Sequence, residues 1–395
     1  MPSRRTAVAG ASLLLLAVGA APAPVSAAPS PLSSTASSTA SSTAPSEVRR
    51  AAAAAEPLRL VNGQMLARGV SLHALGYADD RGRLTGQVIT VNLSATSVGV
   101  ENTSTHRVAQ RATLDRLSGG AVAAVNGDFF DVAGTGAPRG FGISRSRGVL
   151  HGPDAGWNHA FFMTRTGRVG IGPLDLQARL AEFPTVRVSG VNSPTVADHS
   201  VGVYNTRWGP VVDAAALTGG DRDVRTAVIS RGRVVLNAPT NRRSMPPDGF
   251  VLVARGDAAS QLLAMPYGRV VTPRAAVAGN PAVAVGGSGL LAKDGVVVNR
   301  SNTTLAPRTS IAYDRHANRL FLIVVDGRSS RSRGATHYEM ATIATRIGAE
   351  DALNLDGGGS TTMLAHVAGR LRLANRPSDG GMRAIPNGIA LVPRG

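Results

Sequence analysis

Alternation of polar and apolar residues dominates the chain and predicts a fold rich in β-strands. Between residues 69 and 100 the apolar positions recur every second residue, as they do in half-buried strands. Residues 185–300 show short strand-like runs separated by Pro and Gly turns. Helical periodicity is confined to a few segments. The pattern therefore predicts an α+β fold with a mixed β-sheet core and few helices.

Two continuous apolar runs predict buried strands, and an Asp-Gly pair directly follows each of them. Residues 320–325 precede Asp326, and residues 352–355 precede Asp356. A segment with helical spacing, residues 336–347, connects the two runs. If both strands belong to one sheet, the crossover helix brings both carboxyl groups to the same edge of that sheet.

The ends of the predicted helices carry recognisable signals. Thr336 and Glu339 have the spacing of a capping box, and Gly348 fits the C-terminal end of the same helix. Residues 107–117 predict a second, short helix. A third buried strand is expected at residues 121–125, and it too ends on a polar residue followed by Gly.

The strand end at residues 354–362 is the most informative stretch of the sequence. Asn354 and Asp356 share one side of the predicted strand, whereas Leu353 and Leu355 point into a core. Glycine permits close approach of a ligand to the backbone. The loop that follows consists of Gly357, Gly358, Gly359, Ser360, Thr361 and Thr362. This pattern predicts a small site for an oxygen-rich ligand, although a plain Gly-rich turn capped by Asp356 would give it too. A Walker phosphate loop is excluded because no Gly-Lys-Ser/Thr follows.

Short motifs occur along the chain at Asn126-Gly-Asp-Phe-Phe130, 290–295, Arg308-Thr309, Asp326-Gly-Arg328, Glu339-Met-Ala341, Asn354 to Ser360, 377–379 and 383–388. In their order and spacing these motifs resemble those of the phosphodiester glycosidase family. The resemblance extends from about residue 114 to the C-terminus, and its most specific part is the Asn-Leu-Asp-Gly-Gly-Gly-Ser run. The family often has Gly or another residue at the position of Asp128, so Asp128 is not expected to be a universal catalyst.

The resemblance implies cleavage of a sugar that is linked through an anomeric phosphodiester. Such a reaction needs a proton donor, a base or nucleophile, and stabilisation of an oxocarbenium-like centre. Asp356 is the first candidate for acid, base or nucleophile, and Asp326 and Glu339 are the further catalytic candidates. For Glu339, a role as helix cap alone remains an alternative.

The remaining candidates are predicted to bind substrate. Arginine and backbone N–H groups suit a phosphate, and amide side chains suit sugar hydroxyl or acetamido groups. For Arg308, structural pairing with Asp326 or Asp314 is the alternative, and for Asp128 a turn is the alternative. The predicted binding residues are Asn126, Asp128, Arg308, Thr309, Arg328, Asn354, Gly357, Gly358, Gly359 and Ser360.

Charge and composition restrict the classes of binding partner and cofactor that the sequence predicts. The formal net charge is +17, carried almost entirely by scattered arginines, since Lys293 is the only lysine. Scattered charge without interleaved aromatic residues argues against nucleic acid and fits anionic cell-wall polymers. There is no cysteine and no paired-histidine motif, so no zinc site and no cofactor are expected. A Ca²⁺ or Mg²⁺ ion held by Asp326 and Asp356 would be chemically sensible.

The N-terminal composition predicts export and four regions. Basic, apolar and small-residue segments in succession indicate a signal peptide over residues 1–27, without a stable membrane anchor. A Ser/Thr/Ala-rich linker, residues 28–56, is expected to be disordered. A strand-rich segment, residues 57–112, would precede a phosphodiester glycosidase-like domain at residues 113–395.

Together, the resemblance and the N-terminus predict a secreted hydrolase of a sugar-1-phosphodiester in an extracellular glycan. The alternatives are a hydrolase of an ordinary glycosidic bond and a non-catalytic glycan-binding module.

Overall fold

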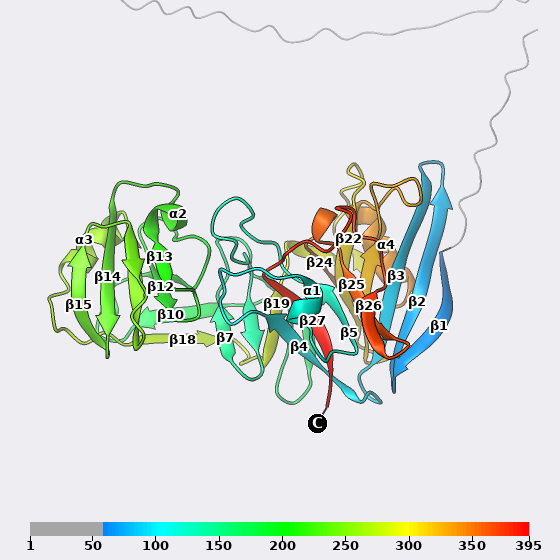
Figure 1. Cartoon of the computed structure of the whole chain (residues 1–395), viewed down its shortest axis with the longest axis horizontal. Coiled ribbons are helices and arrows are strands. Elements are labelled where there is room, and N and C mark those ends of the chain that lie inside the picture. The colour runs from blue at the N-terminus through cyan, green and yellow to red at the C-terminus, as the bar shows by residue number, and fades with distance from the viewer. Residues whose placement is uncertain (1–57, 395) are drawn as a thin grey trace, which may run out of the picture. The chain divides into compact units, whose positions relative to one another are not determined.

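An eight-stranded antiparallel sheet carries the elements that the sequence singles out. The computed structural model describes residues 58–394 (Figure 1). The first three strands form a meander at one side of this sheet, and β20 and β21 close the other side. In sheet order the strands are β1 (Arg59–Ala67), β2 (Val70–Asp79), β3 (Gly82–Asn92), β23 (Arg319–Val325), β22 (Arg308–Asp314), β24 (Asp351–Leu355), β20 (Gly289–Lys293) and β21 (Val296–Val297).

Strand β22 lies between β23 and β24 and pairs antiparallel with both. Strands β23 and β24 therefore run in the same direction and end at the same edge of the sheet, as the sequence predicts. Helix α4 (His337–Arg346) connects them and packs its apolar side on the sheet. Its predicted capping box is confirmed: the Thr336 side chain accepts from the Glu339 N–H at 3.1 Å, and Glu339 accepts from the Thr336 N–H at 2.8 Å.

A second sheet packs against the face of the first sheet that is opposite α4. Val125 and Ile389 from this sheet share one buried cluster with Val324, Leu353 and Leu355 of the first sheet. Figure 1 shows the C-terminal strand of this sheet, β27, in red beside β4 and β5. A short helix, α1 (Leu114–Leu117), lies against this sheet. The strands are β26 (Arg370–Leu373), β25 (Met363–Val367), β5 (Ala123–Asn126), β27 (Asn387–Pro393) and β4 (Val98–Ser104).

A third sheet of five strands extends the same core. Phe161 and Val285 from this sheet are buried in the cluster that joins the first two sheets. Its strands are β7 (Gly148–His151), β6 (Gly142–Ser144), β19 (Val283–Gly286), β8 (His159–Met163) and β9 (Val169–Pro173).

Most of the middle region forms a further sheet with apolar clusters of its own, drawn in green in Figure 1. The strands are β11 (Val188–Val191), β12 (Val201–Asn205), β17 (Gly249–Arg255), β14 (Val224–Ser230) and β15 (Arg233–Ala238). Helices α2 (Ala214–Thr218) and α3 (Asp257–Leu263) pack on it. The two-stranded pairs are β10 (Leu176–Leu180) with β18 (Pro273–Val277) and β13 (Val211–Asp213) with β16 (Arg242–Ser244).

The structure bears out a sheet-rich fold with few helices and corrects two details. Among the described strands, only β11 and β12 pair in parallel, so the core sheets are antiparallel and not mixed. The helix expected at 107–117 is reduced to α1. The preceding backbone bonds elsewhere: the Val108 N–H donates to the Arg207 carbonyl at 2.7 Å, and the Ala112 N–H donates to the Ile385 carbonyl at 3.0 Å.

The predicted N-terminal regions are placed in part by the structure. Residues 1–27 and 28–56 lie outside the described residues. Of the strands in the predicted segment 57–112, β1 to β3 belong to the first sheet and β4 to the second. Across residues 58–394 we find no helix with the length and apolar character needed to span a membrane.

Candidate active site

The candidate site lies where β23 and β24 end and β22 begins. Asp326 and Asp356 follow the two outer strands, and Arg308 is the first residue of the strand between them. The register places Arg308 opposite Val325, next to Asp326 in sequence. Antiparallel placement of β22 thus delivers an arginine to the edge where both acids emerge.

Asn126, at the end of β5, joins the second sheet to this edge. Its Nδ2 donates to the Asp356 carbonyl at 2.7 Å, and its Oδ1 accepts from Thr309 Oγ1 at 2.8 Å and from the Thr362 N–H at 3.0 Å. Asn126 and Thr309 are fully buried. Their polar groups are turned toward protein partners, so the contacts support a positioning role for both residues; direct contact with substrate stays a prediction.

Asp128 lies two residues beyond Asn126 and is 2% exposed. Its N–H donates to Asn387 Oδ1 at 2.8 Å, and its Oδ2 accepts from the Gly140 N–H. The other oxygen, Oδ1, has no partner among the described residues. Gly286 borders the carboxyl group closely, since a Cβ there would lie 2.7 Å from Oδ2. The backbone thus encloses one carboxyl oxygen and leaves the other unpaired.

Asp128 and Asp356 form an electrostatically coupled pair. Burial, against the hydrogen bond from Gly140 and with a smaller contribution from the nearby Asp356 charge, raises the pKa of Asp128 to about 8. Burial also raises the pKa of Asp356 to about 6, although the Gly357 N–H and Arg383 act to lower it. At neutral pH the pair therefore holds one proton, on Asp128, and one charge, on Asp356.

Buried polar atoms without a protein partner gather around this pair. Six of the nine such side-chain atoms in the described chain belong to residues at this edge or next to it: Asp128, Ser310, Asn354, Ser360, Thr361 and Asn387. Asn354 donates through Nδ2 to Ser288 Oγ at 2.8 Å, while its Oδ1 has no partner. Because buried polar groups are nearly always hydrogen-bonded, such a concentration indicates a place for a polar ligand or water.

Arg308 is held by the start of the crossover helix. Its Nε donates to the Ala335 carbonyl at 3.0 Å, one terminal nitrogen donates to the Thr304 carbonyl at 3.0 Å, and the other lies 2.8 Å from His337 Nε2. Burial lowers the pKa of Arg308, and the nearby Arg328 charge lowers it further. Two guanidinium groups thus lie close enough to repel each other.

No acid in residues 58–394 forms an ion pair with either arginine. The alternative in which Arg308 pairs with Asp326 or Asp314 is not seen in the described ion pairs. Arg328 is exposed, has a φ of 57°, and lies beside the loop, 3.3 Å from where a Cβ of Gly358 would be. Neighbouring arginines without carboxylate partners are a typical arrangement for binding an anion.

The Gly-rich loop forms a short 3₁₀ turn, η1 (Gly358–Ser360), whose backbone is largely committed to the protein. The Gly357 N–H donates to Asp356 Oδ1 at 2.9 Å, and the Gly358 N–H donates to the Pro307 carbonyl at 2.8 Å. A Cβ at Gly359 would lie 2.1 Å from both Asp379 and Arg383, so glycine here makes room for that ion pair. The predicted phosphate cradle therefore has at least two of its three amides already bonded within the protein.

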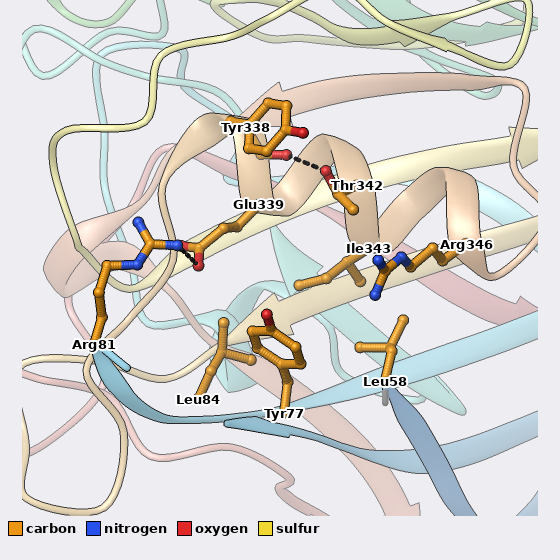
Figure 2. A pocket seen from close by; sticks show the side chains of 9 residues that line it. All are labelled: Leu58, Tyr77, Arg81, Leu84, Tyr338, Glu339, Thr342, Ile343 and Arg346. Carbon is orange, nitrogen blue, oxygen red and sulfur yellow. Dashed lines mark hydrogen bonds and ion pairs between the residues drawn. The ribbon is translucent and has the colours of Figure 1, made fainter. Parts of the chain in front are cut away.

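Glu339 serves the start of α4. Both of its carboxylate oxygens accept hydrogen bonds. Arg333 donates to them at 2.8 and 3.1 Å, and the Thr336 N–H donates to Oε2 at 2.8 Å. Arg81 forms an ion pair with Oε1. Figure 2 shows Glu339 directed at Arg81 along a small pocket of about 150 Å³ under the helix, which Tyr77 also lines. These contacts support a structural role for Glu339, and its catalytic role stays a prediction.

Asp326 faces a second pocket. Its Oδ1 accepts from Asn375 Nδ2 at 3.1 Å and from the Arg376 N–H at 2.9 Å, and burial raises its pKa. The pocket has a volume of about 510 Å³ and is also lined by Arg83, Arg331 and Arg376. Asp326 thus lies at the shared edge, in a pocket whose lining includes neither Asp128 nor Asp356. No cluster of three His, Asp or Glu side chains suited to a metal ion occurs in the described part of the chain.

The sequence did not predict the burial and raised pKa of Asp128, or the hydrogen bond by which Asn387 positions it. Asp128 is predicted only as a binding residue or a turn, because a lone Asn-Gly-Asp signal says nothing about burial. Asn387 anchors the Asp128 backbone from β27, and its Nδ2 has no partner among residues 58–394. Its position in the matching segment 383–388 is the one signal that points to it.

Two carboxyl groups with separated pKa values are an arrangement that glycosidases use, and neighbouring arginines without carboxylate partners suit an anion. Comparison with known proteins agrees with that class. The family model for phosphodiester glycosidases matches residues 223–392, which include Arg308, Asp326 and Asp356 but not Asp128. The resemblance seen in the sequence is therefore confirmed over these residues.

Individual relatives are more distant. An N-acetylglucosamine-1-phosphodiester alpha-N-acetylglucosaminidase from Bos taurus is 37% identical over 81 residues, which are 20% of this chain and 14% of the relative's length. Two solved structures share the fold over 86% of this chain: a hypothetical protein from Synechocystis, with 21% identity, a TM-score of 0.68 and 64% of its chain covered, and a Burkholderia pseudomallei protein classed as a candidate exported protein, with 16% identity, a TM-score of 0.67 and 97% covered.

Proposed function

We propose that this protein is a phosphodiester glycosidase that hydrolyses the bond between an anomeric carbon and a phosphodiester. The observation that carries the proposal is the Asp128–Asp356 pair, with pKa values of about 8 and about 6. At pH 7 this pair supplies one protonated and one ionised carboxyl group in the same buried site. Glycoside cleavage uses these two states together.

The two carboxyl groups take separate roles in this proposal. The unpaired Oδ1 of Asp128 carries the proton and gives it to the phosphate oxygen that leaves as the C1–O bond breaks. The Asp356 carboxylate either activates the attacking water or attacks C1 to form a glycosyl-enzyme ester, which water then hydrolyses. The products are a free sugar and a phosphomonoester. Asn126 fixes the Asp356 backbone, and Asn387 fixes the Asp128 backbone, so both groups are positioned before substrate binds.

Arg308 and Arg328 bind the phosphate in this proposal. Their mutual repulsion in the free protein is relieved when an anion lies between them, and this adds to the binding of a charged substrate. The unpartnered Oδ1 of Asn354 is an acceptor for a sugar hydroxyl or acetamido group on the same edge.

The biological setting belongs to the proposal as well. The signal-like N-terminus and the net charge of +17 favour a secreted enzyme that acts on extracellular or cell-surface glycans with anionic linkages. N-terminal sequencing of secreted material should give a chain that begins near residue 28. Recovery of the intact N-terminus in the membrane fraction would contradict export with cleavage.

A direct assay separates the proposed activity from the two alternatives. The substrate is N-acetylglucosamine-1-phosphate esterified to a chromogenic alcohol, with a coupling phosphatase to release the dye from the phosphomonoester product. The matched control is the chromogenic N-acetylglucosaminide that lacks the phosphate. Turnover of the phosphodiester alone supports the proposal. Preferential turnover of the plain glycoside indicates an ordinary glycosidase, and binding of both without turnover indicates a glycan-binding module.

A further inference from the structure

An aromatic pair lies next to the carboxyl site. Phe129 directly follows Asp128, and its ring centroid lies 5.4 Å from that of Trp157 at an interplanar angle of 52°. Both side chains are only half-buried. Large aromatic side chains are normally placed in the core, so a partly exposed pair beside a buried carboxyl pair offers ring surface to a ligand.

Arg139 holds the Trp157 ring in place. Its guanidinium carbon lies 5.5 Å from the indole centroid, and one terminal nitrogen donates to Asp154 Oδ2 at 2.9 Å. The backbone adds further support, because the Arg139 N–H donates to the Phe129 carbonyl at 2.9 Å and the Trp157 N–H donates to the Asp154 carbonyl at 3.0 Å. The ring is therefore oriented before any ligand arrives, which reduces the entropy lost on binding.

A polar pocket of about 380 Å³ adjoins the aromatic pair, since the residues on either side of Trp157, Gly156 and Asn158, line it. Its volume lies within the range of ligand pockets. The lining contains hydrogen-bond donors and acceptors and charged groups of both signs. They come from Asp154, Asn158, Asp175, Arg187, Ser189 and Thr195. Asp154 is already neutralised by Arg139. Such a lining suits a neutral, hydroxyl-rich ligand better than an ion or an apolar molecule.

We propose that Trp157, Phe129 and this pocket form a subsite for a neutral saccharide on the leaving-group side of the substrate. The assignment to the leaving-group side rests on the proposed function, because Asp128 is the acid that protonates the leaving phosphate and Phe129 is its neighbour in sequence. The sugar ring stacks on the aromatic face while its hydroxyl groups bind the polar lining. The enzyme then recognises both groups joined by the phosphodiester.

Fluorescence offers a test that does not require activity. The chain has two tryptophans, Trp157 and Trp208, and Trp208 is 4% exposed against Tyr204. In a Trp208→Phe variant, Trp157 alone reports on the subsite. Titration with maltotriose, chitotriose and mannotriose should give a saturable change in emission with at least one of them. Absence of any change with all three would overturn the subsite.

Kinetics and a matched control complete the test. Trp157→Ala should raise KM by about tenfold or more for a phosphodiester with a saccharide leaving group, and leave KM for a phosphodiester with a small alcohol unchanged. Phe183→Ala serves as the matched control. The guanidinium carbon of Arg269 lies 5.7 Å from the Phe183 ring centroid, but this ring packs against an apolar cluster of the middle region and does not line the pocket of the proposed subsite. An equal rise in KM for both substrates would contradict the assignment to the leaving-group side. Saccharide binding by a protein that turns over neither substrate would sink the proposed function and keep the subsite.

Discussion

The Asp356 N–H donates a hydrogen bond to the Gly127 carbonyl at 3.0 Å. This bond connects the loop after β24 directly to the residue before Asp128. The main chain thus fixes the backbones that carry the two carboxyl groups relative to each other. Burial is the main cause of both raised pKa values, and this proximity adds the effect of the Asp356 charge on the pKa of Asp128.

The pH dependence of turnover should be bell-shaped. Activity should rise as Asp356 ionises with an apparent pKa near 6, and fall as Asp128 loses its proton near pH 8. Since the two groups interact, these values describe the pair. Measurement of kcat/KM between pH 4 and 10 checks this expectation. A profile that stays flat between pH 5 and 9 would show that neither carboxyl group controls the rate.

Asp128→Asn should lower activity and raise stability. The folded-state pKa of about 8 lies above the unfolded value of roughly 4, so between these pH values the folded state holds a proton that the unfolded state has lost. The contribution of Asp128 to stability therefore falls as pH rises from 4 to 8. The Asn variant lacks this loss, so its melting temperature should exceed that of the wild type at pH 8 and approach it at pH 4. A lower melting temperature at pH 8 would contradict the buried-acid assignment.

Asp356→Asn should remove most activity with little change in fold. The side chain keeps its shape but cannot ionise, and acid–base groups typically contribute about 10²–10⁴-fold to rate. Circular dichroism and thermal melting establish that the variant is folded before rates are compared. Wild-type turnover in the folded variant would exclude Asp356 from catalysis. The residual rate should also lose the rise near pH 6.

Arg308→Lys and Arg328→Gly should separate structural from binding roles. Arg308 makes three contacts with the loop and helix around it, so Lys should lower both the melting temperature and kcat/KM. Arg328 is exposed with positive φ, a conformation that glycine adopts readily, so Arg328→Gly should leave the melting temperature nearly unchanged and raise KM. Unaltered KM in the Arg328 variant would remove that residue from substrate binding.

Local signals predicted the sheet edge correctly. The apolar runs before Asp326 and Asp356 and the capping box at Thr336 each depend on residues close in sequence, and the structure confirms all three. The helix at 107–117 failed for the opposite reason. Its backbone groups find partners at Arg207 and Ile385, which no local pattern reveals.

The sequence suggested candidate residues for the site but not their arrangement in space. Burial distinguishes Asp128 from an ordinary turn residue, and it involves Gly140, 12 residues along the chain, and Gly286 from a distant strand. Likewise, the partners of Glu339 include Arg81, which is 258 residues away. Long-range contacts of this kind decide which carboxyl groups are neutralised by arginines and which retain a proton.

The bonds that fix the carboxyl pair join residues very far apart along the chain. Asn126 and Asp356 are 230 residues apart, and Asp128 and Asn387 are 259 apart. Contacts of such high sequence separation form slowly, because the loop-closure entropy is lost before the contact stabilises the chain. We therefore expect the recovery of enzymatic activity during refolding to lag behind secondary structure, and to coincide with the docking of β27 as the final step.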